Sequence, residues 1–269
     1  GTYGTSLTLT NSGGSGTGNI SYSVSGTGCS ITSGVLSKDA AGDCSVTVSK
    51  ATDTNYEAAS SSATTVAFAQ APNAITFGSL ADRLWSASTF TVSPTATSGD
   101  TPTVASTTTN VCTVTSLTVT MVSSGTCSLT ASEDGNGNYL AATNVVRTFE
   151  IARVTPSAAT WTDVTVTYSA ANQSVSPPAV SFGGSSIDGA WTFVSSDTTV
   201  VSLASSTMTF GNFGTATVTG SFTPTDTGKY NSISATMNVS VEKIRPLFTW
   251  ANVSKIYGDV PFSLTTPTV

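Results

Sequence analysis

Four cysteines are the residues of this 269-residue chain with the clearest capacity for chemistry. Cys29 and Cys44 are 15 positions apart, and Cys112 and Cys127 have the same separation. The equal spacing predicts two disulfides, Cys29–Cys44 and Cys112–Cys127, which persist in an oxidising compartment. Buried free thiols and a zinc site are the alternatives, but the chain has neither a histidine nor a CxxC motif to complete the usual zinc ligands.

A second set of possible ligands lies at 133–138, in the segment EDGNGN. Asp134, Asn136 and Asn138 alternate as in the first half of a calcium-binding loop, with Glu133 beside them. The glutamate that closes such a loop is absent. Turns also prefer Asp, Asn and Gly, because these residues tolerate left-handed backbone conformations. We therefore expect a turn without a functional metal site, and calcium binding is the alternative.

The sequence offers little for catalysis. Without histidine, a catalytic triad based on that residue is impossible. The 15 carboxylates lie mostly in predicted turns, whereas a glycosidase needs two carboxylates that face each other in a cleft. We expect a protein that is not an enzyme and needs no cofactor.

Composition indicates an all-β fold. Thr occurs 51 times and Ser 43 times, and 9% of the residues are charged. Ser and Thr compete with the helical backbone for hydrogen bonds, whereas Thr and Val suit a pleated sheet. The net charge is −6 and the nine basic residues are dispersed, so we expect neither nucleic-acid binding nor a polybasic membrane patch. No apolar run approaches the roughly 20 residues that span a bilayer.

An internal repeat of the sequence organises these residues. The phrase GDCSVTVS at 42–49 returns as GTCSLTAS at 125–132 and as GTATVTGS at 214–221. A tyrosine follows each phrase, at Tyr56, Tyr139 and Tyr230. Another aromatic residue precedes each phrase, at Tyr3, Trp85 and Tyr168, and a fourth, Tyr257, follows the last phrase; steps of 82, 83 and 89 residues separate the four. In the third copy Val201 and Ala216 replace both cysteines, as expected if the two residues form one bond.

Each repeat consists of short predicted strands. In the second they lie at 74–78, 89–97, 102–106, 111–115, 117–122, 126–132 and 145–151. Seven short strands in about 80 residues are typical of an immunoglobulin-like β-sandwich. We predict tandem sandwiches in an elongated string: repeat 1 at 1–70 without its first strand, repeat 2 at 71–152, repeat 3 at 153–243, and the start of a fourth at 244–269. Because the chain opens without Met or a signal-peptide pattern, we expect a segment of a longer protein.

The strand pattern limits how the cysteines can pair. The run from Cys29 to Cys44 reads as strand, turn, strand, turn and the start of a third strand. If the three strands followed one another in one sheet, the cysteines would be about 9.5 Å apart, two strand spacings. A disulfide needs Cα atoms within about 7 Å. The bridged strands must therefore be direct neighbours or lie in facing sheets.

Four phrases carry a resemblance to a known family: YGDVPFSL at 257–264, ITFG at 75–78, GTCSLT at 125–130 and NYLAA at 138–142. They resemble the tandem immunoglobulin-like repeats of large bacterial secreted or cell-surface proteins of the adhesin type. The resemblance covers essentially the whole chain and implies an extracellular or cell-surface array, with no particular ligand. Repeat 3 departs most, because it lacks the cysteines and carries the longer segment SPPAVSFGGSSIDGAWTF.

Three functional hypotheses follow. The first is a non-catalytic structural or adhesin stalk whose partners are neighbouring repeats of the same protein. The second is a filament subunit in which the strand 248–253 of one chain completes repeat 1 of another by strand donation, burying Phe248, Trp250 and Val253. The third is a carbohydrate-binding module, which needs an exposed aromatic row such as Trp191 and Phe193. The sequence identifies no glycan or protein ligand.

Overall fold

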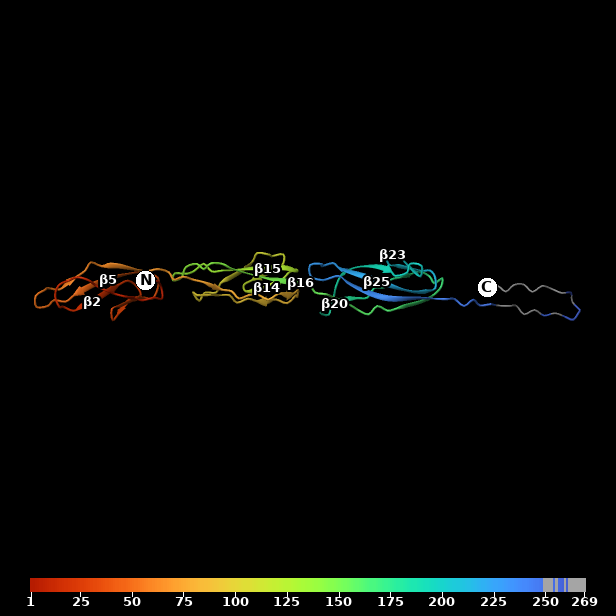
Figure 1. Ribbon diagram of the computed structural model, residues 1–269, viewed down its shortest axis with the longest axis horizontal. Coiled ribbons are helices and arrows are strands. Elements are labelled where there is room, and N and C mark those ends of the chain that lie inside the picture. Colours follow the sequence, from red (N-terminus) through yellow and green to blue (C-terminus); the bar gives the residue numbers. More distant parts are fainter. Residues whose placement is uncertain (249–253, 255, 259, 261–269) are drawn as a thin grey trace. The chain divides into compact units, whose positions relative to one another are not determined.

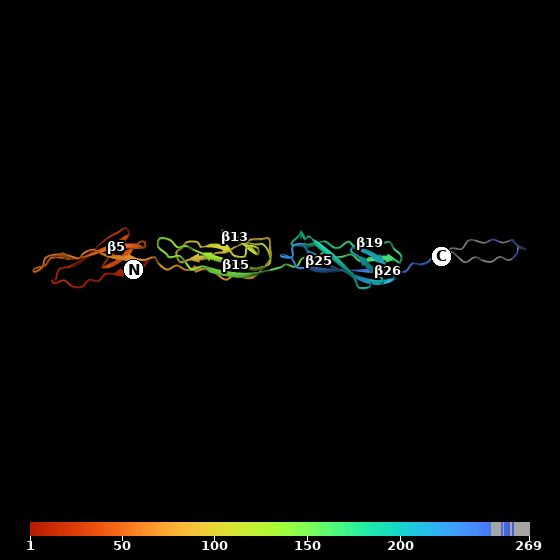
Figure 2. The same ribbon diagram turned by 90° about the horizontal axis from the view of Figure 1, so that it is seen from above.

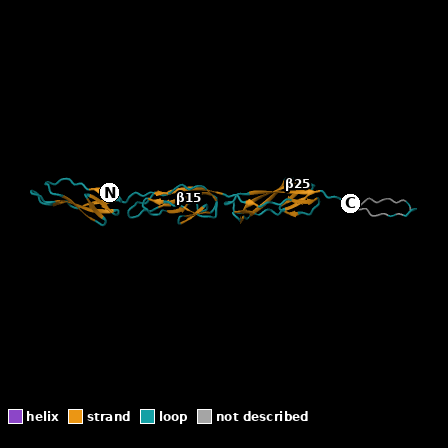
Figure 3. Ribbon diagram, turned by 90° about the horizontal axis from the view of Figure 1, so that it is seen from below, coloured by secondary structure: helices purple, strands orange, loops and turns teal. Residues whose placement is uncertain are grey.

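Alternating side chains make the recurring phrase a strand in each repeat. In β15 (Gly125–Ser132) Cys127, Leu129 and Ala131 are buried, and the residues between them are only partly so. Successive side chains of a strand point to opposite faces, so one face of this strand covers the core. The computed structural model describes residues 1–248, 254, 256–258 and 260. Every named element in that part of the chain is a strand (Figure 3).

The chain divides into two compact units, Gly1–Ala152 and Arg153–Val269. The first unit contains repeats 1 and 2, and the second contains repeat 3 (Figure 1). The boundary that the sequence predicts between residues 70 and 71 lies inside the first unit and stays a prediction. The predicted fourth repeat at 244–269 lies largely outside the described residues.

Repeat 2 is a sandwich of two main sheets, one ordered β12-β15-β16-β9 and the other β10-β14-β13, and β11 pairs with β8. Besides β15, its strands are β8 (Ile75–Thr76), β9 (Arg83–Leu84), β10 (Phe90–Thr91), β11 (Thr95–Ala96), β12 (Thr103–Ser106), β13 (Cys112–Thr115), β14 (Thr118–Met121) and β16 (Val145–Ala152). Side chains from both sheets, among them Val119, Leu129 and Phe149, are buried in one core. This is the all-β, immunoglobulin-like sandwich that the sequence predicts.

Repeat 3 has the same two-sheet plan, with the orders β18-β26-β25-β22 and β19-β24-β23 (Figure 2). Its strands are β17 (Ser157–Ala158), β18 (Val164–Thr167), β19 (Gln173–Ser174), β20 (Val180–Phe182), β21 (Ser185–Ser186), β22 (Gly189–Ser195), β23 (Val201–Ala204), β24 (Thr207–Phe210), β25 (Gly214–Pro224) and β26 (Ile233–Glu242). The longer segment of this repeat forms the hairpin of β20 and β21, and β17 pairs with β20 to make a third, small sheet.

Repeat 1 has the smallest core. One sheet joins β2, β5 and β6, with β7 also paired to β5, and the other has the order β1-β4-β3. The strands are β1 (Leu7–Thr8), β2 (Ile20–Ser25), β3 (Cys29–Thr32), β4 (Val35–Lys38), β5 (Gly42–Lys50), β6 (Ala59–Ser60) and β7 (Thr64–Phe68). Its buried cluster is Leu36, Cys44, Val46 and Phe68. In repeat 2 the opening segment supplies two further buried residues, Ile75 and Phe77.

Two strand predictions for repeat 2 are wrong. The segment predicted as one strand at 89–97 is two, because β10 pairs with β14 and β11 pairs with β8. The chain changes sheet between them at Pro94, which has no backbone N–H to donate to a ladder. The prediction also lacks β9, which pairs in parallel with the end of β16. The two residues of β9, which lie in a charged segment, are too few to show the alternation of apolar and polar side chains that indicates a strand.

Candidate functional site

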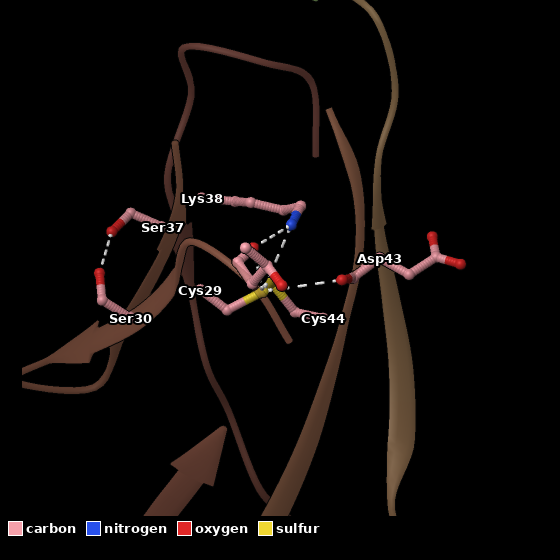
Figure 4. Close-up of a disulfide and its surroundings, with 7 residues drawn as sticks. Cys29, Ser30, Ser37, Lys38, Asp43 and Cys44 are labelled. Carbon is pink, nitrogen blue, oxygen red and sulfur yellow. Dashed lines mark hydrogen bonds between the residues drawn. A yellow bond between two sulfur atoms is a disulfide. The ribbon is translucent and has the colours of Figure 1, made fainter. Parts of the chain in front are cut away.

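The structure contains two disulfides, and each joins the two sheets of one repeat. Cys29 on β3 is bonded to Cys44 on β5, with Cα atoms 6.0 Å apart (Figure 4). Cys112 on β13 is bonded to Cys127 on β15, with Cα atoms 5.6 Å apart. Of the two arrangements that the strand pattern allowed, the bridged strands lie in facing sheets. All four cysteines are bonded, which leaves neither free thiols nor thiolate ligands for zinc.

In repeat 3 an apolar pair occupies the corresponding place. Val201 on β23 and Ala216 on β25 are 0% and 3% exposed and lie in facing sheets. The pair is fully buried in repeats 2 and 3, whereas in repeat 1 Cys44 is buried and Cys29 packs against the core partly buried. Repeats 1 and 2 add a covalent bond between the sheets.

The side-chain oxygens of the 133–138 segment accept hydrogen bonds from the backbone. Oδ1 of Asn136 accepts from the N–H of Asn138 at 2.8 Å and from that of Tyr139 at 3.1 Å. The Glu133 carboxylate accepts from the N–H of Gly135 and from the side chain of Asn73. Within the described residues, no three or more His, Cys, Asp or Glu side chains gather where they could hold a metal ion. The segment therefore forms a turn that ends at Tyr139.

Repeat 1 builds the same turn with an aspartate. Oδ1 of Asp53 accepts from the N–H of Asn55 at 2.9 Å and from that of Tyr56 at 3.0 Å. Its other oxygen accepts from the N–H of Thr17. The bond from Asn55, followed by that from Thr17, lowers the pKa of the Asp53 carboxyl below its ordinary value. We call residues 50–57, 133–140 and 224–231 the tyrosine loops of repeats 1, 2 and 3.

In repeat 2 the tyrosine loop binds the linker that enters the repeat. The N–H of Ala71 donates to the Asn138 carbonyl at 2.8 Å, and the N–H of Leu140 donates to the Ala71 carbonyl at 2.9 Å. Ala71 and Tyr139 thus form a parallel β-bridge. Ala71 is 9% exposed, so the loop covers the linker as well as pairing with it.

Repeat 3 repeats this pairing with different side chains. The N–H of Val154 donates to the Lys229 carbonyl at 3.0 Å, and the N–H of Asn231 donates to the Val154 carbonyl at 2.9 Å. Val154 and Tyr230 form the parallel bridge, and Val154 is 3% exposed. Because only backbone groups make the bridge, the pairing does not depend on the identity of the linker residue.

The tyrosine loop of repeat 2 also contacts residues of repeat 1, within the first unit. The Gln70 side chain donates to the Asn136 carbonyl at 2.6 Å. Oδ1 of Asn138 accepts from the N–H of Ala41 at 3.0 Å. The rings of Tyr3 and Tyr139 meet edge to face, with centroids 5.3 Å apart. Asn138, one of the candidate calcium ligands, therefore binds a neighbouring repeat.

The aromatic row of repeat 3 faces the core side of its sheet. Trp191 pairs with Phe222 and Phe193 pairs with Gly220, and both partners are on the buried face of β25. Trp161 packs against Trp191 and Phe193 from the side, with centroids 6.1 and 5.8 Å away. These rings are half-buried, and a flat sugar-binding platform needs rings that face solvent.

Comparisons with known proteins add little to this picture. No protein-family model matches the chain, and no curated protein matches its sequence. Similar solved structures include Sidekick-1 immunoglobulin domains 1-5, at 15% identity and a TM-score of 0.31 over 84% of this chain and 52% of that one. Mouse cadherin-23 EC22-24 matches at 11% identity and 0.31, over 84% and 86%. The surface layer protein SbsC, domains 1-6, matches at 14% and 0.26, over 86% and 36%.

This chain thus spans about half the length of the first of these structures. The TM-scores are too low for any functional argument. Among the described residues, none belongs to a helix that could cross a membrane.

The linker residues that the tyrosine loops bind are the part of this site that the sequence did not reveal. Ala71 and Val154 stand three positions after a buried residue of the preceding strand, Phe68 and Ile151. That shared spacing was the available signal. The tyrosines mark the repeat in the sequence, but their spacing gives no indication that the loops around them pair with a linker.

Proposed function

We propose that this chain is a non-catalytic structural segment, a repeat stalk of a long bacterial surface or secreted protein of the adhesin type. One observation carries the proposal: the same two backbone hydrogen bonds hold the entry linker of repeat 2 and that of repeat 3. A linker that is paired along its backbone has less freedom than an open one. Consecutive repeats joined in this way suit a role in spacing and load-bearing.

The disulfides support an extracellular or cell-surface location, because such bonds form and persist in oxidising compartments. The partners that this role implies are neighbouring repeats of the same protein. It requires no cofactor.

Single-molecule pulling of the chain between its two ends tests the stalk function. Each repeat should unfold in a separate event. The disulfides of repeats 1 and 2 each join cysteines that are 15 positions apart, so the chain between those cysteines cannot extend. Reduction should therefore lengthen two of the events by about 50 Å each, at about 3.4 Å per residue, and leave that of repeat 3 unchanged. Smooth extension without separate events would contradict a load-bearing role.

A filament subunit is the second candidate, and the open core of repeat 1 favours it. Apolar side chains of Leu9, Tyr22, Val46 and Val66 line a groove of about 320 Å³ in that repeat. A strand donated by another chain could fill such a groove. Of the predicted donor strand 248–253, residues 249–253, including Trp250 and Val253, lie outside the described residues.

The carbohydrate-binding alternative receives no support from the inward-facing aromatic row. A glycan array probed with the chain and with Trp191→Ala tests it, and binding that the substitution removes would restore this function.

A further inference from the structure

We propose that Asn136 is a site of spontaneous deamidation, and that this reaction loosens the joint between repeats 1 and 2. Asn136 and Gly137 form the one Asn-Gly pair of the sequence, and both residues are exposed. They lie in the tyrosine loop of repeat 2, whose hydrogen bonds hold the linker and repeat 1. Such a site is independent of the stalk function, because the reaction requires only the loop and water.

Deamidation begins when the backbone nitrogen of the following residue attacks the side-chain amide carbon. A bond forms between the Gly137 nitrogen and Cγ of Asn136, and the side-chain nitrogen leaves as ammonia with the proton of the Gly137 N–H. The product is a cyclic imide, which water opens on either side. Cleavage between Cγ and the Gly137 nitrogen gives aspartate, and cleavage of the original backbone bond gives isoaspartate.

The loop leaves the attacking group free and polarises the group that it attacks. Within the described residues the N–H of Gly137 forms no hydrogen bond, and glycine has no side chain to obstruct the attack. Oδ1 of Asn136 accepts from the backbone N–H groups of Asn138 and Tyr139. Attack at Cγ places negative charge on this oxygen, and donors already directed at it stabilise that charge, as in an oxyanion hole.

The Asn136 side chain also fixes the position of the loop, because its Nδ2 donates to the Asp100 carboxylate at 2.6 Å. In repeat 1 the counterparts of Asn136 and Asp100 are Asp53 and Thr17, each 83 positions earlier. There the Asp53 carboxylate faces a donor, the N–H of Thr17. In repeat 2 an aspartate at position 136 would instead face the Asp100 carboxylate, and like charges at such a distance repel each other.

The isoaspartate product changes the backbone as well. The chain then runs through the former side chain, and the backbone carbonyl of Asn136 becomes a free carboxylate. That carbonyl accepts from the Gln70 side chain at 2.6 Å. Two residues later, Asn138 accepts from the N–H of Ala71 with its carbonyl and from the N–H of Ala41 with its Oδ1. Both products therefore disturb the turn that binds the linker and repeat 1.

Ageing of the intact chain at mildly alkaline pH tests the site. Peptide mapping by mass spectrometry detects the replacement of ammonia by water, and an isoaspartate-specific methyltransferase labels the isoaspartate product. We expect Asn136 to react faster than every other asparagine, including Asn11, which is exposed and precedes a serine. Gly137→Ala should slow the reaction at least about tenfold, because the added Cβ obstructs the attack. The loop should keep its shape in this variant, since that Cβ meets nothing within 4 Å.

An exchange of the two side chains tests the consequence for the joint. Asn136→Asp reproduces the aspartate product, and the amides of Ala41 and Ala71 should lose hydrogen-exchange protection at least about fivefold, both in this variant and in the aged chain. Adding Asp100→Asn should restore the protection, because the pair again consists of one amide and one carboxylate. Unchanged protection of the β15 amides in both variants shows that repeat 2 remains folded.

Asn110→Asp is the matched control. It places the same new charge on another exposed asparagine of repeat 2, outside the tyrosine loop, and should leave the protection of Ala41 and Ala71 unchanged.

Each part of the proposal can fail separately. If Asn136 reacts no faster than Asn11, or if Gly137→Ala does not slow it, the deamidation site is overturned. Full protection of Ala41 and Ala71 after deamidation, or the same loss of protection in Asn110→Asp, overturns the link to the joint. A loss in Asn136→Asp that Asp100→Asn does not reverse overturns the repulsion as its cause. None of these results bears on the stalk function, which the separate unfolding events under force test independently.

Discussion

At the scale of single residues, one pair of core positions shows what the disulfide adds. Cys112 and Cys127 are completely buried, and Val201 and Ala216 show that an apolar pair can fill the same place. Burial is thus common to both solutions, and the covalent link between the sheets is the difference.

We expect the double substitution Cys112→Val and Cys127→Ala to lower the free energy of unfolding of repeat 2 by about 3 kcal/mol, because a loop of 15 residues is no longer closed in the unfolded chain. Denaturant unfolding and calorimetry both measure this change in the free energy of unfolding. In this variant, reductant should destabilise repeat 1, whose disulfide is intact, and should have no effect on repeat 2, whose disulfide has been removed. Free thiols at all four positions in the untreated protein, found by non-reducing peptide mapping, would contradict the premise.

Asn136 and Asn138 govern the expected response to calcium. Their side-chain oxygens accept backbone hydrogen bonds in the turn and from repeat 1, and Asp134 is exposed beside them. We expect millimolar calcium to leave the melting temperature unchanged, because a cation that does not bind the folded chain cannot stabilise it. A thermal-shift assay is sufficient. A rise of several degrees that Asp134→Ala abolishes would show that calcium does bind.

At the scale of elements, the tyrosine loop depends on a glycine. Gly135 has φ of +79°. A Cβ atom there would lie 2.6 Å from each of three backbone atoms: the carbonyl oxygen of Tyr139, the carbonyl carbon of Leu140 and the amide nitrogen of Ala141. The loop therefore folds back on its own backbone at a point where no side chain fits. The groups that pair with the linker, at Asn138 and Leu140, follow directly.

We expect Gly135→Ala to displace the loop and to break its pairing with Ala71, because the left-handed conformation costs about 1–2 kcal/mol for other residues and the added atom meets backbone. Hydrogen exchange measures this directly, since the amides of Ala71 and Leu140 are the donors of the bridge. Gly137→Ala is the matched control, because a Cβ there meets nothing within 4 Å. Unchanged protection of both amides in Gly135→Ala would contradict the structural role of the loop.

The sequence predicts most of the strands, and the strands that it does not predict are missed for physical reasons. Alternation of apolar and hydroxyl side chains indicates β15 and its copies, since the pattern follows from one buried face. The change of sheet at Pro94 is not legible, because adjacent segments of one extended run pair with different partners.

The pairing of Ala71 with Tyr139 joins residues 68 positions apart through backbone groups. Because backbone groups make this contact, the types of the side chains give little indication of it. The role of Asn138 was missed for the same reason, because its partner is a backbone N–H of repeat 1.

At the scale of the whole molecule, three cores of unequal size share one architecture. The buried clusters contain 12 residues in repeat 2, 10 in repeat 3 and four in repeat 1. Repeats 1 and 2 have a disulfide, whereas repeat 3 has none. The three repeats therefore separate two contributions to stability, the apolar core and the cross-link.

We expect repeat 1 to be the least stable of the three, because its core is the smallest and burial of apolar surface is the main favourable term in folding. A disulfide adds on the order of 3 kcal/mol, whereas each fully buried aliphatic or aromatic side chain adds about 1.5–3 kcal/mol. The difference of six buried residues between repeats 1 and 3 thus outweighs the bond. Hydrogen exchange should then be faster for the amides of β5 than for those of β25. If β25 exchanges first, the cross-link dominates over the core, and reduction of the Cys29–Cys44 bond should reverse the order.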